Sequence, residues 1–109
     1  MNDILLVITN LPDEESAEKL THLLIKARAA ACVSRLASCV STYRWKGDIE
    51  ITAEVPLLIK TSRAAYPRLE NLIREAHPYE LPEIIAVPVT AGFPAYLDWI
   101  SGETATPEE

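Results

Sequence analysis

A loop rich in chemically capable side chains follows the second predicted helix. It reads His77-Pro78-Tyr79-Glu80-Leu81-Pro82-Glu83, and its two prolines stiffen a backbone that presents an imidazole, a phenol and two carboxylates. Imidazole nitrogens and carboxylate oxygens are suitable ligands for copper or zinc. A histidine at a helix end also has a structural use, because its protonated ring favours the negative end of the helix dipole. Both interpretations of His77, ligand binding and helix termination, therefore stay open.

A second group of such residues lies on a predicted hairpin, in Ser41-Thr42-Tyr43-Arg44-Trp45-Lys46-Gly47. Exposed Tyr, Arg and Trp are the residue types enriched at interface hot spots. The same aromatic residues could instead form a platform for single-stranded nucleic acid. The formal net charge of −6 disfavours that alternative, since an acidic chain repels phosphate backbones.

Lys60 is a single cation after the apolar run Leu57-Leu58-Ile59. It either holds a carboxylate or is solvated at the end of its strand. With Arg44 and His77 it would favour an anion in any cleft that the three residues share.

The two cysteines, Cys32 and Cys39, are separated by six residues, which matches no zinc pattern such as C-x2-C. We expect reduced, mostly buried thiols, with metal or redox chemistry as the alternative. The chain has three glycines and no glycine-rich phosphate loop. The segment Thr9-Asn10-Leu11-Pro12 has no glycine or arginine to cradle an anion, which disfavours an acylphosphatase-like hydrolase. We therefore expect a protein that is not an enzyme.

The apolar periodicity predicts the elements that must position these residues. The expected strands are 4–8, 31–36, 38–45, 49–61 and 84–90, and the expected helices are 13–30, 65–76 and 93–99. Because residues 4–8 are continuously apolar, we expect that strand to be central and buried on both faces. The order β-α-β-β-α-β with a terminal helix indicates an α+β fold of the ferredoxin-like, split βαβ type. It has a long central hairpin, and its helices lie on one face of the sheet.

Prolines and one glycine predict local irregularities. Pro56 cannot donate a ladder hydrogen bond, so we expect a bulge or bend near it in the long return strand. Pro88 indicates an edge strand or a bulge, and Pro67 is tolerated only in the first turn of its helix. Gly102 is expected to end the last helix.

The 109 residues correspond to one domain over 1–102 and a polar, frayed tail over 103–109. No signal-type segment and no membrane span is apparent, so we expect a cytoplasmic protein. The hairpin over 38–61 is long for such a domain, and its outer half cannot rest on the chain's own core. We therefore expect the chain to partner itself, without nucleic acid or membrane.

Five motifs occur in the order and register of one known family: Ala29-Ala30-Ala31-Cys32-Val33, Ser41-x-Tyr43-x-Trp45-x-Gly47, Leu58-Ile59-Lys60-Thr61, His77-Pro78-Tyr79-Glu80-x-Pro82-Glu83-Ile84 and Tyr96-Leu97-x-Trp99. Together they resemble the CutA family, the divalent-cation tolerance proteins, from about residue 4 to residue 99. The resemblance implies a ferredoxin-like fold, a tight homotrimer, high thermal stability and a link to divalent metals, copper in particular. It implies no established catalytic activity.

The resemblance also implies a site. Clefts between subunits would bind a metal ion or small ligand, with His77 as a metal ligand and a lining of Tyr43, Trp45, Lys60, Tyr79 and Glu80. The trimeric nitrogen-regulatory PII proteins have a similar architecture. A small-metabolite sensor or assembly module acting on a partner protein is therefore the alternative function.

Two departures from the family pattern matter. The family's copper ligands are a cysteine at the end of the first strand and a histidine pair before Pro-Tyr, where this chain has Thr9 and Ala76-His77. We therefore expect no required cofactor and only weak binding of Cu(II) or another divalent cation. The family's Pro-Gly turn after Ala-Cys-Val is replaced by residues 34–39 without glycine, so we expect a wider turn there.

Overall fold

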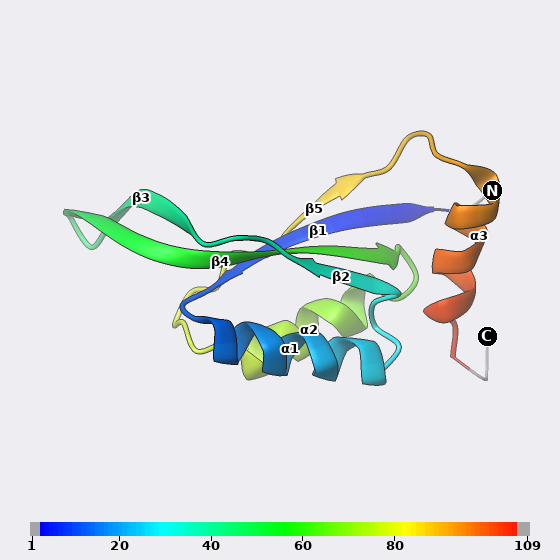
Figure 1. Cartoon of the computed structure of the whole chain (residues 1–109), viewed down its shortest axis with the longest axis horizontal. Helices are drawn as coiled ribbons and strands as arrows, with labels where there is room; N and C mark the ends of the chain where they lie inside the picture. The colour runs from blue at the N-terminus through cyan, green and yellow to red at the C-terminus, as the bar shows by residue number, and fades with distance from the viewer. Residues whose placement is uncertain (1–2, 107–109) are drawn as a thin grey trace.

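A computed structural model describes residues 3–106 as an α+β fold with one antiparallel sheet and three helices (Figure 1). The strands are β1 (Ile4–Leu11), β2 (Cys32–Arg35), β3 (Cys39–Trp45), β4 (Asp48–Ser62) and β5 (Ile85–Pro88). The helices are α1 (Glu14–Lys26), α2 (Tyr66–Ala76) and α3 (Pro94–Glu103). α1 and α2 cover one face of the sheet, while α3 lies at the end opposite the hairpin tip. The predicted α+β class, long hairpin and C-terminal helix are confirmed.

β4 is the common partner of three strands. It pairs with β1 from Leu11↔Val55 to Ile4↔Ser62, and with β2 and β3 in succession. β1 lies between β4 and β5, so its predicted central position is confirmed, as is the edge position of β5. β1 is not buried on both faces as expected, because its side chains alternate between buried and half-buried from Leu5 onward.

The irregularity predicted near Pro56 lies on the neighbouring strand. Arg35 pairs with Leu57 and Cys39 with Glu54, so four steps along β2–β3 match three steps along β4. The extra residue is therefore in segment 36–38, where the sequence indicated a wider turn, and β4 itself is continuous. The Pro56 carbonyl accepts from the Leu36 N–H at 3.0 Å, so the side of Pro56 that lacks a donor faces this segment.

The first helix starts as predicted and ends early. The Asp13 carboxylate accepts from the Ser16 N–H at 2.7 Å, a cap that lowers the pKa of Asp13. α1 ends at Lys26 rather than near residue 30, because Arg28 takes a left-handed φ of 57° that turns the chain. Ala29 and Ala30 are then buried in the core outside the helix.

Two prolines set the limits of the second helix. α2 begins after Ala65 with Pro67 in its first turn, as predicted, and the Ser62 hydroxyl accepts from the Ala65 N–H at 3.2 Å. It ends at Ala76, because His77, the residue before Pro78, avoids the helical region. This ending delivers His77 and the loop after it to the end of β1.

The C-terminal helix runs further than the sequence indicated. α3 continues through Gly102 to Glu103, so the predicted stop at Gly102 is wrong. Arg28 donates to the carbonyls of Gly102 and Ala105 at 3.0 Å each, which satisfies backbone groups at the helix end. Thr104 is 1% exposed, so the expected tail begins inside the fold, and its residues 107–109 lie outside the described residues.

The core fills the space between the sheet and the two covering helices. Its largest members come from β1, β4, α1 and α2, and include Leu11, Leu24, Leu57, Ile59, Leu69 and Ile73. Over residues 3–106, no helix has the length and hydropathy needed to cross a membrane.

Candidate functional site

A groove of ≈ 530 Å³ lies where the hairpin, from Glu54 near its base to Trp45 beside its tip, meets the loop between α2 and β5. Four of the predicted site residues line it: Tyr43, Trp45, Tyr79 and Glu80. The remaining lining residues are Asn10, Arg44, Glu54, Pro78, Leu81 and Glu83. The two segments that the sequence singled out, far apart along the chain, therefore form one site.

A buried carboxylate forms part of the groove wall. Glu54 on β4 is 7% exposed and accepts a hydrogen bond from the Tyr79 hydroxyl at 2.9 Å. Burial, followed by this hydrogen bond and the charge of Glu54, raises the pKa of Tyr79 to about 12. Tyr79 therefore stays a neutral donor to Glu54 throughout the physiological pH range.

His77 supports the loop from behind the groove. The residue is 7% exposed, and its ring lies 4.9 Å from the Tyr79 ring, centroid to centroid. The Tyr79 N–H donates to Nδ1 at 3.1 Å, which leaves Nε2 as the donor to the Asn10 carbonyl at 2.6 Å. Burial lowers the pKa of His77, although the Asn10 hydrogen bond and Glu54 oppose this shift. The ring is thus a neutral brace between the loop and β1.

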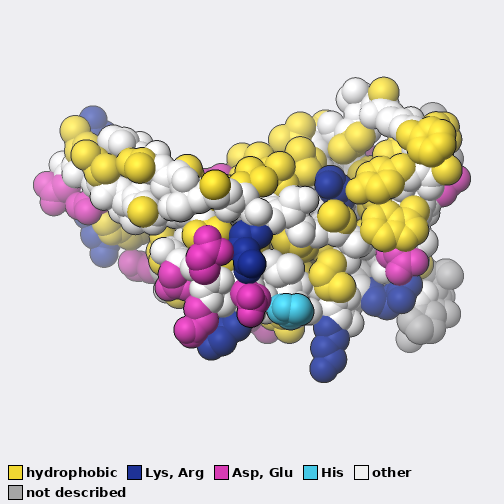
Figure 2. Space-filling view, viewed as in Figure 1, with side chains coloured by type: hydrophobic (Ala, Val, Ile, Leu, Met, Phe, Trp, Pro, Cys, Tyr) yellow, Lys and Arg dark blue, Asp and Glu magenta, His cyan; other side chains and the backbone are white. Residues whose placement is uncertain are grey.

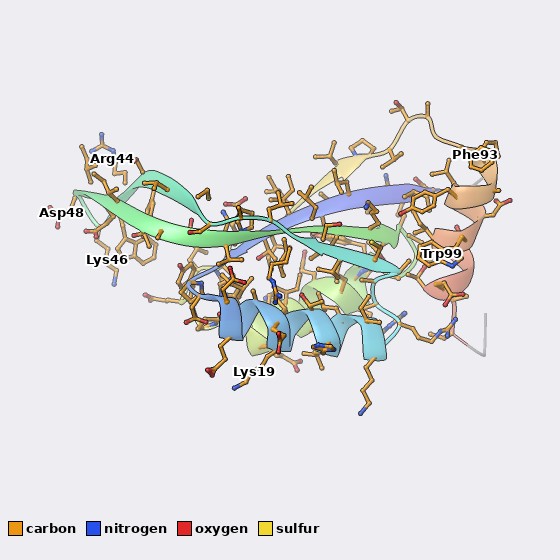
Figure 3. The ribbon with its side chains drawn as sticks, in the orientation of Figure 1. Lys19, Arg44, Lys46, Asp48, Phe93 and Trp99 are labelled. Carbon is orange, nitrogen blue, oxygen red and sulfur yellow. The ribbon has the colours of Figure 1, made fainter. Side chains whose placement is uncertain are left out.

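The side chain of Lys46 places an ammonium group at the rim of the groove. The Lys46 ammonium lies 5.4 Å from the Trp45 ring centroid and 3.7 Å from a Glu80 carboxylate oxygen. Figure 3 shows Lys46 and Arg44 leaving the hairpin on opposite sides near its tip. These contacts join the hairpin to the loop across the open side of the groove.

Two further hydrogen bonds hold polar groups along the groove. The Asn10 side-chain amide donates to Glu83 at 3.0 Å, which ties the end of β1 to the loop before β5. The Tyr43 hydroxyl pairs with that of Thr52 at 3.2 Å across the hairpin.

Lys60 lies elsewhere in the chain. It is six residues beyond Glu54 on β4, roughly 20 Å away at about 3.3 Å per strand residue. Its ammonium contacts the Cys32 thiol at 3.8 Å instead. Cys32 and Cys39 are free and half-buried rather than mostly buried.

The expected preference for an anion does not hold within one chain. Of the three cations expected to share the cleft, Lys60 is remote and His77 lies behind the groove with its pKa lowered. Arg44 also lines the groove, but its side chain leaves the hairpin on the side opposite to Lys46, the cation that pairs with Glu80.

The sequence profile of one family, described as CutA1 divalent ion tolerance protein, matches residues 5–103. This chain belongs to that family. Membership associates the CutA chain with tolerance to divalent ions, and the resemblance drawn from its motifs is confirmed.

Individual CutA relatives support the match. A crystal structure of CutA from Xylella fastidiosa superimposes with a TM-score of 0.92 at 46% identity, covering 94% of this chain and 99% of that one. The divalent-cation tolerance protein CutA of Thermus thermophilus is 39% identical over 98 residues, which is 90% of this chain and 95% of that protein. Protein CutA of Mus musculus is 42% identical over 89 residues, and the match spans 82% of this chain and 50% of the mouse protein.

Because CutA relatives are named for divalent cations, we tested whether the side chains of this chain fit a metal ion. Among residues 3–106, no three His, Cys, Asp or Glu side chains are grouped to hold one. A metal at His77 would have to displace Asn10 or Tyr79 from the ring. Thr9, at the family's cysteine position, is fully buried, and its hydroxyl has no hydrogen-bond partner. Within this single chain, the side chains of residues 3–106 therefore do not form a metal centre.

Sequence reasoning missed Glu54, the buried carboxylate of the groove. The pairing register of the hairpin could have identified it. Lys46 and Gly47 both have positive φ, 49° and 88°, and form a two-residue turn that pairs Trp45 with Asp48. Counting back from that pair sets Cys39 opposite Glu54, and so places Glu54 on the face that carries Tyr43 and Trp45.

Proposed function

We propose that this chain forms a homotrimer in the cytoplasm and binds a small ligand at the groove without catalysing a reaction. In the trimer the groove would lie in a cleft between subunits. Its role in tolerance to divalent metals would then depend on the assembled, ligand-binding form. The observation that carries the proposal is the hairpin, which joins the groove to a large uncovered apolar surface.

The hairpin is apolar where its own chain leaves it uncovered. Val40, Ile49 and Ile51 are 72%, 67% and 71% exposed on its outer part. Figure 2 shows hydrophobic side chains gathered over this end of the molecule and again around α3. Contiguous exposed apolar surface on a small domain marks an interface, since its burial stabilises association. Such a surface supports contact with further copies of the chain.

The order β2-β4-β1-β5, with two helices on one face, supports a ferredoxin-like assignment. β5 and the β2–β3 segment are unpaired edges of this sheet within one chain. Pairing of edges between copies would protect their free backbone groups. That the assembly contains three copies is what the CutA resemblance implies.

The groove favours an organic ligand over a bare metal ion. Its aromatic and carboxylate lining suits a small molecule, whereas its one nearby imidazole is hydrogen-bonded at both nitrogens. Because both nitrogens of the His77 ring are hydrogen-bonded, this imidazole is not free to act as a general base at the groove, which supports a non-catalytic role. Copper binding by His77 would cost one of its hydrogen bonds, so we expect it to be weak.

A metabolite sensor that passes its signal to a partner protein, as in the PII-like alternative, uses the same groove. The exposed aromatic side chains of Phe93, Tyr96 and Trp99 favour it as a second candidate, because they lie on α3 and at its N-cap, away from the groove. A partner could therefore dock there without covering the ligand.

Light scattering on the purified protein tests the assembly. We expect a mass of about three times the 12.1 kDa of the chain. Ile51→Glu should lower that mass, because it places a charge on the apolar hairpin. Ile25→Glu is the matched control, since Ile25 is also exposed but lies on α1. A wild-type mass near 12.1 kDa would remove the trimer and its clefts.

Calorimetric titration with Cu(II) tests the metal component. His77→Ala should weaken whatever binding the wild type shows. Cys32→Ser and Cys39→Ser serve as controls, because thiolates bind copper well. Equal binding by wild type and His77→Ala would dismiss His77 as a ligand.

A further inference from the structure

The groove contains a carboxylate whose charge is not neutralised. Glu54 is 7% exposed, and its hydrogen bond comes from the neutral Tyr79 hydroxyl. Among residues 3–106, no Lys, Arg or His forms an ion pair with it. Buried carboxylates are normally paired with a cation or with several donors, because desolvating the charge is costly. A carboxylate can accept about four hydrogen bonds, so Glu54 has capacity left for a partner in the groove.

The rim of the same groove shows how such a partner is held. There the Lys46 ammonium lies beside the Trp45 ring and the Glu80 carboxylate, at 5.4 Å and 3.7 Å. An aromatic face and a carboxylate form an established receptor for an organic cation. Nearer Glu54, Tyr79 and Tyr43 supply the aromatic surface and Glu54 the carboxylate, but no cation among residues 3–106 forms an ion pair with Glu54.

The charge balance of the lining points the same way. Glu54, Glu80 and Glu83 line the groove against Arg44. Lys46 offsets Glu80 at the rim, and the Asn10 amide that holds Glu83 is neutral. A ligand cation would therefore enter a region of negative potential, whereas an anion would meet a buried carboxylate.

We propose that the groove takes a small organic cation, with its ammonium or guanidinium group against Glu54 and its flat body between Tyr43, Trp45 and Tyr79. This inference rests on the proposed function, in which the groove binds a small ligand, and adds the chemical class of that ligand. It separates the groove from a metal centre, because the cation is held by one carboxylate and aromatic faces rather than by grouped ligands.

Three probes of one shape and different charge test the inference: benzylamine, benzyl alcohol and benzoate. Binding is followed by the indole N–H resonances of the ¹⁵N-labelled assembled protein. Trp45 lines the groove and Trp99 lies on α3, so the second indole is an internal control. Trp45→Phe assigns the two resonances. We expect benzylammonium to shift Trp45 but not Trp99, and to bind at least tenfold more tightly than the other two probes.

The variant Glu54→Gln removes the charge and keeps the shape. It should bring the affinity for benzylammonium to within about twofold of that for benzyl alcohol. Glu50→Gln is the matched control, because Glu50 is exposed on the same face of β4 but outside the groove lining. It should leave the affinity unchanged.

The outcomes separate this inference from the proposed function. Benzyl alcohol or benzoate binding at Trp45 as tightly as benzylammonium would overturn the cation preference and leave ligand binding in place. An absence of any shift at Trp45 in the intact assembly would overturn both. The comparison of the three probes in the wild type decides the matter even if Glu54→Gln fails to fold.

Discussion

The Tyr79 hydroxyl donates a hydrogen bond of 2.9 Å to the buried Glu54 carboxylate and so joins the loop after α2 to the base of the hairpin. This contact links residues from the two segments that form the groove. Loss of the phenol proton removes the bond and sets two negative charges against each other. The contact therefore has a consequence at alkaline pH.

Stability should fall between about pH 10 and pH 12 as the Tyr79 proton is lost. The pKa of Tyr79 is raised from 10.0 to about 12 in the fold, so the unfolded chain loses the proton first and becomes relatively more stable. Tyr79→Phe should reduce this alkaline loss and cost about 1 kcal/mol at pH 7, a hydrogen bond to a charged acceptor discounted for partial exposure. Urea unfolding at a series of pH values measures both. Tyr43→Phe is the control, because its hydroxyl pairs with the neutral Thr52, and it should retain the alkaline loss.

Acid should weaken the brace at His77. Its pKa in the fold is lowered from 6.5, chiefly by burial, so below about pH 6.5 the unfolded chain binds the proton more readily than the folded one. The stabilisation from the neutral ring is therefore present above pH 6.5 and is lost as the pH falls through the lower folded value. His77→Ala should flatten this dependence and cost about 2 kcal/mol or more at pH 7, since two buried hydrogen bonds are lost.

Urea unfolding at pH 5, 6, 7 and 8 checks the His77 prediction at one fixed protein concentration, because assembly makes stability depend on concentration. His22→Ala is the matched control, since His22 is exposed on α1. A pH dependence that persists in His77→Ala and disappears in His22→Ala would show that His22, and not His77, causes it, and would contradict the prediction.

Arg28 combines a strained backbone with a useful side chain. Its φ of 57° favours glycine, while its guanidinium donates to the carbonyls of Gly102 and Ala105. Arg28→Ala should lose those bonds and keep the strain, at a cost of about 1–2 kcal/mol. Arg28→Gly should lose the same bonds but recover about 1 kcal/mol from the backbone. Equal denaturant midpoints for the two variants would show that the left-handed conformation contributes nothing.

Two glycines should respond oppositely to alanine. Gly47 has φ of 88° at the hairpin tip with nothing within 4 Å of an added Cβ, so Gly47→Ala meets backbone strain alone. We expect it to cost about 1 kcal/mol. Gly102 lies in α3 with the same open surroundings, so Gly102→Ala should stabilise by about 0.5–1 kcal/mol. Thermal denaturation of both variants at one concentration gives the signs, and a loss at Gly102 would contradict the helical account.

Local patterns predicted the elements well where one residue type decides the backbone. Pro78 ended α2 and Pro88 marked an edge strand, because a missing donor or a fixed φ acts whatever the surroundings. Gly102 did not end α3, because glycine permits a helix to end but does not require it. The hydrogen bond from Arg28 and the burial of Thr104 hold the end of the helix in the fold. The early end of α1 depended on Arg28 in a conformation that its residue type does not favour.

The sequence predicted the aromatic residues of the candidate site, but it did not predict which charged residues lie there. Tyr43, Trp45 and Tyr79 stand out by type, and their segments meet in the groove. Lys60 was grouped with them by chemistry, although its distance along β4 rules out a shared site within one chain. Glu54 looks like an ordinary hairpin residue, and its burial arises only when the loop after α2 packs over it.

The position of β4 also has a consequence for how the chain folds. Of the described strands, β1, β2 and β3 all precede β4, and every strand pair of the sheet includes either β4 or the still later β5. No ladder between the described strands can form during synthesis until β4 begins to emerge, and the β3–β4 ladder needs only residues 48–54. The local β3–β4 hairpin then closes first, because short loops cost the least entropy, and β1 can join only afterwards across more than forty residues. A nascent chain halted before β4 would display three strands with no partner, and those strands would be exposed to aggregation.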